Sequence, residues 1–452
     1  MSAGQRAATP EESVPEIRPF RALRYDRAVV GDPGLVVAPP YDVIGPEQRA
    51  SMVARHPANI VNLDLPADEL GDEADDRYRR AARTLAAWRS DGTLRKDPHP
   101  SVYVYEQTYV VPGTQTERTQ RGFFGRLRLE SFGPEAGVLP HERTLAGPRE
   151  DRYKLLRATG VNTSPVVALF EDAAGATGKR LAFAAAGPPD LEVTDEDGVR
   201  HRLWAVPADG EGASAEIAAA LIAAASARPV IIADGHHRYE TALQYRDERR
   251  MTRSCEEDPP FDYLLTLFLE ATGEPLTVLP THRIVTGVTH GGETLVERAR
   301  ALFEVEPVDS TSALLEPFER VGLESGGRGR FGLWTRDGGA LLTARRDAFA
   351  SLLPPGGEAL RSLDVSLLGI ALEQLLGVDA AAVANGAVVY TKSAAQAIDE
   401  VDSVESDAAF LLEGTPVRSI LAVARAGDVM PQKSTYFYPK ALSGLLINPH
   451  EW

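Results

Sequence analysis

One turn of the chain concentrates residues that suit phosphate binding. The apolar stretch 229–233 runs into Asp234-Gly235-His236-His237-Arg238, and a helical pattern follows over 239–249. A strand that turns directly into a helix directs free backbone N–H groups and the positive end of the helix dipole at one point, which attracts phosphate. Arg238 can add a bidentate contact, a histidine can donate a further hydrogen bond, and Asp234 can hold Mg²⁺.

Two other interpretations of this turn stay open. Asp234 or one of the histidines can cap the helix and do nothing else. His236 and His237 are also possible zinc ligands, in a set that Asp42, Glu142 or His282 would complete. Adjacent residues of a strand point to opposite faces, however, and no His-x-x-x-His spacing occurs. Capping alone does not need two histidines and an arginine, so phosphate binding is favoured.

A second polar segment precedes a helix that starts at Pro148. Its residues His141, Glu142 and Arg143 lie in a loop, where functional groups tend to be displayed. The mixed charges that follow are typical of a solvated helix start with salt bridges. Farther along, the turn that contains Asn162 and Ser164 can present an amide and a hydroxyl to a ligand. Loop and turn together are candidates for substrate binding.

Two further segments carry candidate site residues. Tyr41 and Asp42 follow Pro39-Pro40, and a loop stiffened by proline can place a carboxylate with little loss of entropy. Asp is also common in turns for structural reasons alone. Near the C-terminus, lysines and hydroxyls surround three aromatic residues, which suggests a segment that closes over an anionic ligand. Its candidate residues are Lys433, Ser434, Thr435 and Tyr436.

The elements around these segments mix hairpins with helices. Turn residues separate β-rich runs at Pro112-Gly113, Asp197-Gly198 and Asp337-Gly338-Gly339, and each pair of runs predicts an antiparallel hairpin. Helices are expected over 69–89, 213–227, 360–376 and 416–426. Hairpins interleaved with helices favour an α+β fold with mixed, largely antiparallel sheets over a doubly wound parallel sheet.

Composition and length limit the class of protein. The chain has 452 residues, of which 43% are hydrophobic and 25% charged, as in soluble globular proteins. Residues 1–15 are small and polar and should form a flexible tail. We expect two α+β regions. The first covers 16–250 and carries the Tyr41-Asp42 loop, the loop with His141 and the Asp234–Arg238 turn. The second covers 251–452, and its C-terminal segment completes the site. A single cysteine, Cys255, excludes an intrachain disulfide.

Charge and hydropathy set the expected partners. The 48 basic and 65 acidic residues leave a net charge of −17, which repels nucleic acid and anionic membranes. A few converging basic side chains can still form a local anion pocket. Because no apolar run is long enough for a membrane span or a signal core, we expect a cytoplasmic protein. The sequence does not predict the oligomeric state.

Seven segments of the chain, in the same order, resemble the bacterial and archaeal family of domains of unknown function numbered 1015. The resemblance extends from Ile17 to Pro449 and identifies the chain as a member of that family. The segments are RPFRALRY, VVAPPYDVI, HERTLAGPREDRYKLL, NTSPV, ADGHHRYETAL, PTHR and KSTYFYPKALSGLL. The resemblance implies no settled activity.

The segment ADGHHRY also resembles the phosphate-binding turn of the ParB and sulfiredoxin superfamily, which includes free-serine kinases. This resemblance implies a ParB/sulfiredoxin-like nucleotide-binding portion in which residues 235–238 hold nucleotide phosphates. It does not imply sulfiredoxin activity, because His236 stands where the catalytic cysteine would be. Partition of nucleic acid is disfavoured by the net charge and by the lack of an evident helix-turn-helix.

The expected function is therefore nucleotide-dependent phosphoryl transfer to a small hydroxyl compound, for which the resemblance suggests free serine or a related amino acid. The expected cofactors are ATP or another nucleotide and Mg²⁺, the latter held by Asp234 or Glu142. The candidate catalytic residues are Asp42, Glu142 and His237. Two alternatives stay open: a phosphatase of a small metabolite such as phosphoserine, and a nucleotide-sensing module without catalysis.

Overall fold

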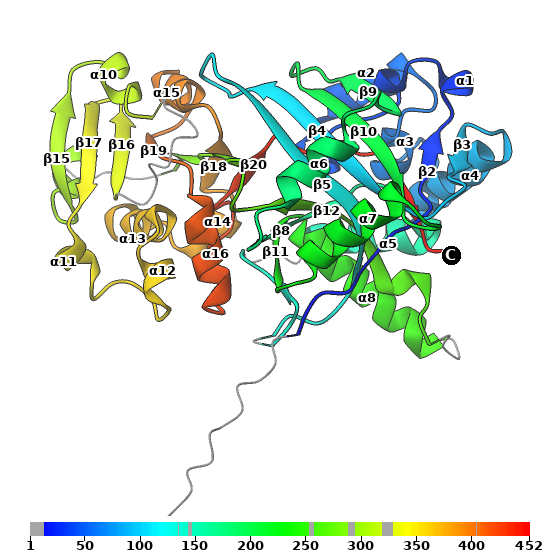
Figure 1. Cartoon of the computed structure of the whole chain (residues 1–452). Coiled ribbons are helices and arrows are strands. Elements are labelled where there is room, and N and C mark those ends of the chain that lie inside the picture. The colour runs from blue at the N-terminus through cyan, green and yellow to red at the C-terminus, as the bar shows by residue number, and fades with distance from the viewer. Residues whose placement is uncertain are drawn as a thin grey trace, which may run out of the picture.

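Two β-sheets organise the chain, each with helices on its faces (Figure 1). The computed structural model describes residues 13–133, 135–142, 147–252, 257–287, 294–318, 329–403 and 405–452. Arg143 and Cys255 therefore lie outside the described residues. The larger sheet is mixed and the described strand pairs of the smaller sheet are all antiparallel, so the expected α+β class with largely antiparallel sheets is confirmed.

The larger sheet has nine strands. In spatial order they are β6 (Val138–Leu139), β11 (Val230–Asp234), β8 (Val166–Phe170), β12 (Tyr263–Glu270), β5 (Glu117–Arg128), β4 (Ser101–Val110), β10 (Arg200–Pro207) and β9 (Leu191–Thr194), with β1 (Ile17–Arg18) beside β5. Two neighbouring pairs, β6 with β11 and β8 with β12, are parallel, and the other pairs are antiparallel.

Two of the predicted hairpins lie in this sheet: β4 with β5, and β9 with β10. Alternate residues of β4 face opposite sides, as strand geometry requires. Val102 and Val104 contribute to the hydrophobic core on one face, whereas Tyr103 and Tyr105 contribute to the core on the other. Both faces of the strand are thus buried. The larger sheet is the middle layer of the first of two bodies, each of which consists of one of the two sheets and the helices packed on it.

Helices cover one face of the larger sheet. Leu181, Leu221 and Tyr239 pack into the same core as Val104. They belong to α6 (Thr177–Ala184), α7 (Ala213–Ala225) and α8 (His236–Thr252). The opposite face packs against Phe437 and other residues near the C-terminus, in one hydrophobic cluster that continues into the second body.

The smaller sheet has six strands and forms the second body. In spatial order they are β15 (Phe303–Val308), β17 (Gly338–Ala344), β16 (Arg330–Thr335), β19 (Ala408–Leu412), β14 (His282–Val285) and β18 (Val388–Thr391). The pairing of β16 with β17 confirms the third predicted hairpin. Helices α10 (Thr311–Leu315) and α15 (Ala394–Asp402) cover one face, and α13 (Asp364–Leu376) covers the other (Figure 1).

The C-terminal residues return from the second body to the first. Strand β20 (Tyr436–Tyr438) pairs with β13 (Thr277–Leu279), and β21 (Asn448–Pro449) pairs with β7 (Val161–Asn162). Strand β12 also belongs to the larger sheet, although it follows residue 250. The two sheets therefore do not divide simply at that residue, and the division into 16–250 and 251–452 stays a prediction.

The remaining elements surround these sheets. They include β2 (Leu23–Tyr25), which pairs with β3 (Leu94–Lys96). The others are α1 (Arg27–Val30), η1 (Pro33–Leu35), η2 (Tyr41–Val43), α2 (Pro46–Arg55), α3 (Val61–Asp64), α4 (Asp76–Ser90), α5 (Gly147–Thr159), η3 (Pro260–Asp262), α9 (Leu295–Ala299), α11 (Arg346–Phe349), α12 (Glu358–Arg361), α14 (Ala380–Ala384) and α16 (Val417–Arg425). The predicted helix over 69–89 starts later, at Asp76, and residues 66–75 are not helical.

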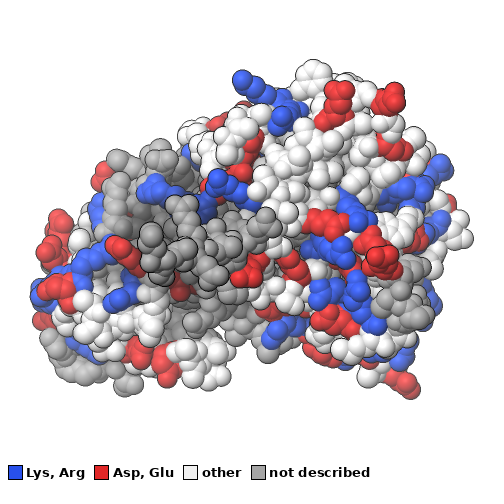
Figure 2. Space-filling model, turned by 60° about the horizontal axis from the view of Figure 1, so that its bottom comes forward, with Lys and Arg blue, Asp and Glu red and all other residues white. Residues whose placement is uncertain are grey.

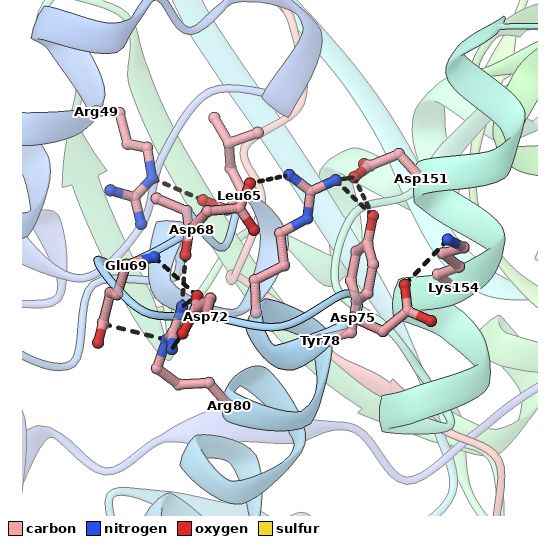
Figure 3. Close-up of polar contacts among 12 residues, drawn as sticks. Arg49, Leu65, Asp68, Glu69, Asp72, Asp75, Tyr78, Arg80, Asp151 and Lys154 are labelled. Carbon is pink, nitrogen blue, oxygen red and sulfur yellow. Dashed lines mark hydrogen bonds and ion pairs between the residues drawn. The ribbon is translucent and has the colours of Figure 1, made fainter.

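Polar contacts fix α5 against α4 (Figure 3). The hydroxyl of Tyr78 donates to Oδ1 of Asp151 at 2.7 Å, and Nζ of Lys154 lies 2.9 Å from Oδ1 of Asp75. Because α5 follows the His141-Glu142 segment and carries Arg152, these contacts help to position one wall of the site described below.

The surface carries both signs of charge. Acidic and basic side chains are interspersed over the face seen in Figure 2. Within the described part of the chain, no helix is long and apolar enough to cross a membrane.

Candidate functional site

The predicted phosphate-binding turn joins β11 to α8. Strand β11 is buried and ends at Asp234, Gly235 has a φ of +87°, and α8 begins at His236. The helix starts three residues before the expected Tyr239, so His236, His237 and Arg238 form its first turn. The backbone N–H groups of a first turn have no acceptor within the helix, and they lie at the positive end of its dipole. The motif itself thus provides amides suited to an anion.

The carboxylate of Asp234 lies between two cations. Nζ of Lys440 is 2.6 Å from its Oδ1, and Nη2 of Arg238 is 2.7 Å from its Oδ2. Burial alone would raise the pKa of Asp234, but Lys440 and Arg238 hold it below its ordinary value. Two positive charges thus meet one negative charge beside the first-turn amides.

Gly235 allows the guanidinium of Arg238 to fold back over the turn. A Cβ atom at residue 235 would lie 3.0 Å from Cζ of Arg238, and the positive φ is itself unfavourable for other residues. Nη1 of Arg238 donates to the carbonyl oxygen of Pro165, at the start of β8. Arg238 therefore bridges the turn and the neighbouring strand, with 10% of its side chain exposed.

His141 and His236 form a buried pair. The backbone N–H of His141 donates to Nε2 of His236 at 3.3 Å, and the ring centroids are 4.7 Å apart. Nδ1 of His141 contacts the carbonyl oxygen of Ile232, so Nδ1 carries the proton and Nε2 accepts from the hydroxyl of Thr435 at 2.9 Å. Burial lowers the pKa of His141 to about 4 and that of His236 well below its ordinary range. Both rings are neutral at pH 7.

Glu142 holds the C-terminal segment. Its Oε1 accepts the backbone N–H of Lys433 at 3.0 Å, and its Oε2 accepts that of Ser434 at 3.1 Å. Burial raises the pKa of Glu142 to about 7, against the opposing effect of these two N–H groups. Lys433 has a φ of +55° and an exposed side chain, whereas Ser434 is buried. Both oxygens of Glu142 are thus used to fix backbone.

Tyr41 and Asp42 lie in η2, within electrostatic reach of Arg238. The ring of Tyr41 stacks on the guanidinium of Arg152, with Cζ 4.0 Å from the ring centroid. Asp42 is exposed, and no hydrogen bond or ion pair joins its carboxylate to another described residue. Burial acts to lower the pKa of Arg238, but Asp234, Asp42 and Tyr41 raise it, which places this loop within electrostatic reach of the turn.

Tyr436 contacts lysines from both bodies. Nζ of Lys440 and Nζ of Lys392 each lie 4.3 Å from its ring centroid, and Lys392 also donates to its hydroxyl at 3.1 Å. Burial raises the pKa of Tyr436, and the charges of Asp234 and Asp42 raise it further. The second body thus reaches the site through Lys392, which precedes α15.

The remaining candidate residues have different surroundings in the structure. Oδ1 of Asn162 accepts from the backbone N–H of Leu265 at 3.2 Å and from Nδ2 of Asn448 at 2.7 Å, so this amide joins strands. Ser164 is buried and lines a small pocket that also contains Arg238. His237 is half-buried in the first turn of α8. Arg143 lies outside the described residues, and its predicted role stays a prediction.

Five polar residues of this region were not predicted from the sequence: Asp64, Arg152, Thr241, Arg283 and Lys392. Arg283, at the start of β14, donates to the backbone oxygen of Lys433 at 3.4 Å. It belongs to the PTHR segment of the family resemblance, which was the available signal. Arg152 stands within the mixed charges of a helix start, and no local pattern distinguishes Asp64 or Lys392.

The predicted Mg²⁺ ligands do not form a metal site. Both oxygens of Asp234 contact cations, and both oxygens of Glu142 accept backbone N–H groups. Among the described residues, no group of three or more His, Cys, Asp or Glu side chains is arranged to hold a metal ion. The donors present are therefore unsuited to Mg²⁺ in this arrangement.

Comparisons with known proteins give a family match over most of the chain. The family described as "Protein of unknown function (DUF1015)" matches residues 17–366. No curated protein matches the chain.

Three solved structures resemble part of the fold. A conserved hypothetical protein from Pyrococcus furiosus is 14% identical, with 67% of this chain and 87% of that chain covered and a TM-score of 0.32. A free serine kinase in complex with AMP is 13% identical, with 67% and 83% covered and a TM-score of 0.33. SbnI from Staphylococcus aureus, truncated at its C-terminus, is 11% identical, with 68% and 82% covered and a TM-score of 0.33. Similarity at this level supports no conclusion about ligand or activity.

Proposed function

The chain belongs to the DUF1015 family of proteins of unknown function, and we propose that it is a nucleotide-dependent phosphotransferase that acts on a small hydroxyl compound. The acceptor suggested by the resemblance of the Asp234–Arg238 turn is free serine or a related amino acid. The proposal rests on the chemistry of that turn and of the side chains around it.

The observation that carries the proposal is the convergence of Lys440 and Arg238 on Asp234 at the N-terminus of α8. One carboxylate balances only one of the two cations. The remaining positive charge adds to the first-turn amides and the helix dipole, and the three together favour an anion. A phosphate group is the anion that this combination suits best, because backbone N–H groups and cations can each bind a different phosphate oxygen.

Asp42 is the proposed catalytic carboxylate. It is exposed on a loop that follows two prolines, and no other described residue hydrogen-bonds to it. Its charge acts on both Arg238 and Tyr436, so Asp42 lies within electrostatic reach of the turn and of the C-terminal segment. Glu142 is a positioning residue instead, since both of its oxygens hold the backbone of that segment.

In the proposed reaction, the acceptor hydroxyl oxygen forms a bond to the γ-phosphorus of the nucleotide. The bond from that phosphorus to the bridging oxygen breaks, and the nucleoside diphosphate leaves with the electron pair. Asp42 orients the hydroxyl and accepts its proton. Lys440 and Arg238, together with the first-turn amides, stabilise the negative charge on the phosphoryl oxygens.

Nucleotide binding tests the proposal first. We expect ATP, ADP, CTP or GTP to raise the melting temperature of the protein, because a ligand that binds the folded state stabilises it. Arg238→Ala should abolish this increase. Arg246→Ala is the matched control, since Arg246 lies on the same helix, has 15% of its side chain exposed, and also contacts a carbonyl oxygen and a carboxylate. Absence of any increase with all four nucleotides would contradict the proposal.

A further inference from the structure

A small pocket lies next to Arg238, between α5, α8 and β12. It has a volume of about 50 Å³, and its polar lining includes Asp64, Arg152, Ser164, Arg238 and Thr241. A water molecule needs roughly 10–15 Å³ measured in this way, so the pocket has room for a group of only a few heavy atoms. A nucleoside is far too large for it, whereas one end of a small metabolite fits.

The hydroxyl of Thr241 points to a missing partner. Thr241 lies on α8, one turn after Arg238, and is 2% exposed. Its Oγ1 is buried and has no hydrogen-bond partner among the described residues. A buried hydroxyl without a partner is unfavourable and uncommon in native proteins, and where it lines a pocket a bound ligand or water accounts for it.

The other polar groups of the lining have more unused hydrogen-bond donors than unused hydrogen-bond acceptors. The guanidinium of Arg238 has five N–H donors, and its observed contacts are with the oxygens of Asp234 and Pro165. The carboxylate of Asp64 already accepts from the hydroxyls of Thr163 and Ser443, at 2.6 and 2.9 Å. A ligand group with acceptor oxygens therefore complements this lining.

We propose that this pocket binds the carboxylate of the acceptor, and that the acceptors of this protein are small hydroxycarboxylic acids, with hydroxy amino acids among them. The inference rests on the proposed function, because it names the acceptor class of the same site. Arg238 and the hydroxyls of Ser164 and Thr241 donate to the two carboxylate oxygens. Leu264, buried in the same lining, contacts the short carbon stem.

The position of the pocket fits this role. Arg238 contacts Asp234 through Nη2 and Pro165 through Nη1, so its guanidinium lies between the anion-binding turn and the pocket. Arg152 lines the pocket and stacks on the ring of Tyr41, so an acceptor whose carboxylate is bound there lies near the segment that carries Asp42. A chain of two or three carbon atoms then brings its hydroxyl near the phosphate-binding turn.

The test compares D-glycerate with glycerol at equal concentration and ionic strength, since the two differ by a carboxylate in place of a hydroxymethyl group. The melting temperature of the full chain should rise with D-glycerate and L-serine and stay unchanged with glycerol. In Thr241→Val, which keeps the shape of the side chain, affinity for both should fall at least tenfold. The melting temperature without ligand should be unchanged or higher, because the substitution removes an unpaired buried hydroxyl.

Thr159→Val is the control variant. The hydroxyl of Thr159 donates to the carbonyl oxygen of Leu155 at 2.8 Å, and Thr159 does not line this pocket. The control should bind D-glycerate as the wild type does. If Thr241→Val lowers the melting temperature but leaves binding unchanged, the hydroxyl is structural and the inference is wrong.

The outcomes also separate this inference from the proposed function. If nucleotides bind but D-glycerate and L-serine both fail to stabilise the wild type, the carboxylate pocket is wrong and the phosphotransferase proposal stands. If D-glycerate binds in a manner that depends on Thr241 but no nucleotide binds, the pocket stands and the phosphotransferase proposal fails.

Discussion

Nζ of Lys440 lies 2.6 Å from Oδ1 of Asp234, across 206 residues of sequence. This ion pair joins the C-terminal segment to the end of β11, directly before the N-terminus of α8. The carboxylate of Glu142 also holds this segment, because it accepts the backbone N–H groups of Lys433 and Ser434. The proposed anion site is therefore assembled by long-range contacts and exists only in the folded chain.

Lys440→Met should weaken both the fold and anion binding. The substitution removes one of the two cations on a buried carboxylate, which we expect to cost on the order of 1–3 kcal/mol of unfolding free energy. Nucleotide affinity should fall at least tenfold, measured by calorimetry. Lys96→Met is a control, because Lys96 pairs with Glu451 and has 20% of its side chain exposed, compared with 15% for Lys440. Equal nucleotide affinity in both variants would contradict the role of Lys440.

Gly235→Ala should displace the guanidinium of Arg238. Residue 235 has a positive φ, and the added methyl group would approach Arg238 to 3.0 Å. Gly427→Ala is a matched control, since Gly427 has a φ of +72° and a Cβ atom added there would have no neighbour within 4 Å among the described residues. Both variants should lose roughly 1 kcal/mol from backbone strain alone. Only Gly235→Ala should also lose nucleotide affinity, and a parallel loss in Gly427→Ala would show that strain is the cause.

Asp42→Asn should separate catalysis from binding. The substitution removes the proposed proton acceptor at an exposed position, so the melting temperature should change little. Turnover should fall by roughly 10²–10⁴-fold, the usual contribution of a general base, while nucleotide affinity is retained. Glu47→Gln, at another exposed carboxylate in the first turn of α2, is the control. Full activity in Asp42→Asn would exclude Asp42 as the base.

Much of the fold follows from local sequence patterns. The three hairpins were predicted because glycine-containing turns interrupt strands of alternating residues, and both signals are local. The start of α8 was predicted three residues late, because His236 and His237 have only moderate helix propensity and the preceding strand sets the turn. The membership of β12 in the larger sheet depends on its pairing with β5 and β8, which no local pattern encodes.

The candidate site also contains residues that local sequence predicts and residues that it does not. Residues of the turn, of the Tyr41-Asp42 loop and of the C-terminal segment were predicted because several polar groups stand together in each. The residues next to Asp64 and Thr241 in the sequence do not mark them as site residues, and their importance arises only from what packs around them in the folded chain. Asn162 shows the converse, since a polar turn that suggested a ligand contact is occupied by strand-joining hydrogen bonds.

His282 should make stability depend on acidity. It is 1% exposed, its Nδ1 accepts the backbone N–H of Leu412, and burial lowers its pKa to about 3. Below pH 6.5 the unfolded chain binds a proton that the folded ring does not, so stability falls as the pH falls from 6.5 toward 3. This group alone should cost roughly 2 kcal/mol between pH 6.5 and 5.

The variant His282→Gln keeps an acceptor for Leu412 and removes the titrating ring. Its urea midpoint should therefore fall less than that of the wild type between pH 7.5 and 5. His99→Gln, at an exposed ring, should behave as the wild type does. If His282→Gln and the wild type lose the same stability over this interval, the ring is not held neutral by burial.

The most direct test of the central claim is ³¹P NMR of the full chain with ATP, Mg²⁺ and either D-glycerate or L-serine. The account predicts a new phosphomonoester resonance that grows in step with ADP, and that grows at least about a hundredfold more slowly in Asp42→Asn. Two results would contradict it. One is unchanged ATP with every acceptor, and the other is release of inorganic phosphate in a separate sample that contains phosphoserine and no nucleotide. The first would leave a binding module without catalysis, and the second would identify a phosphatase.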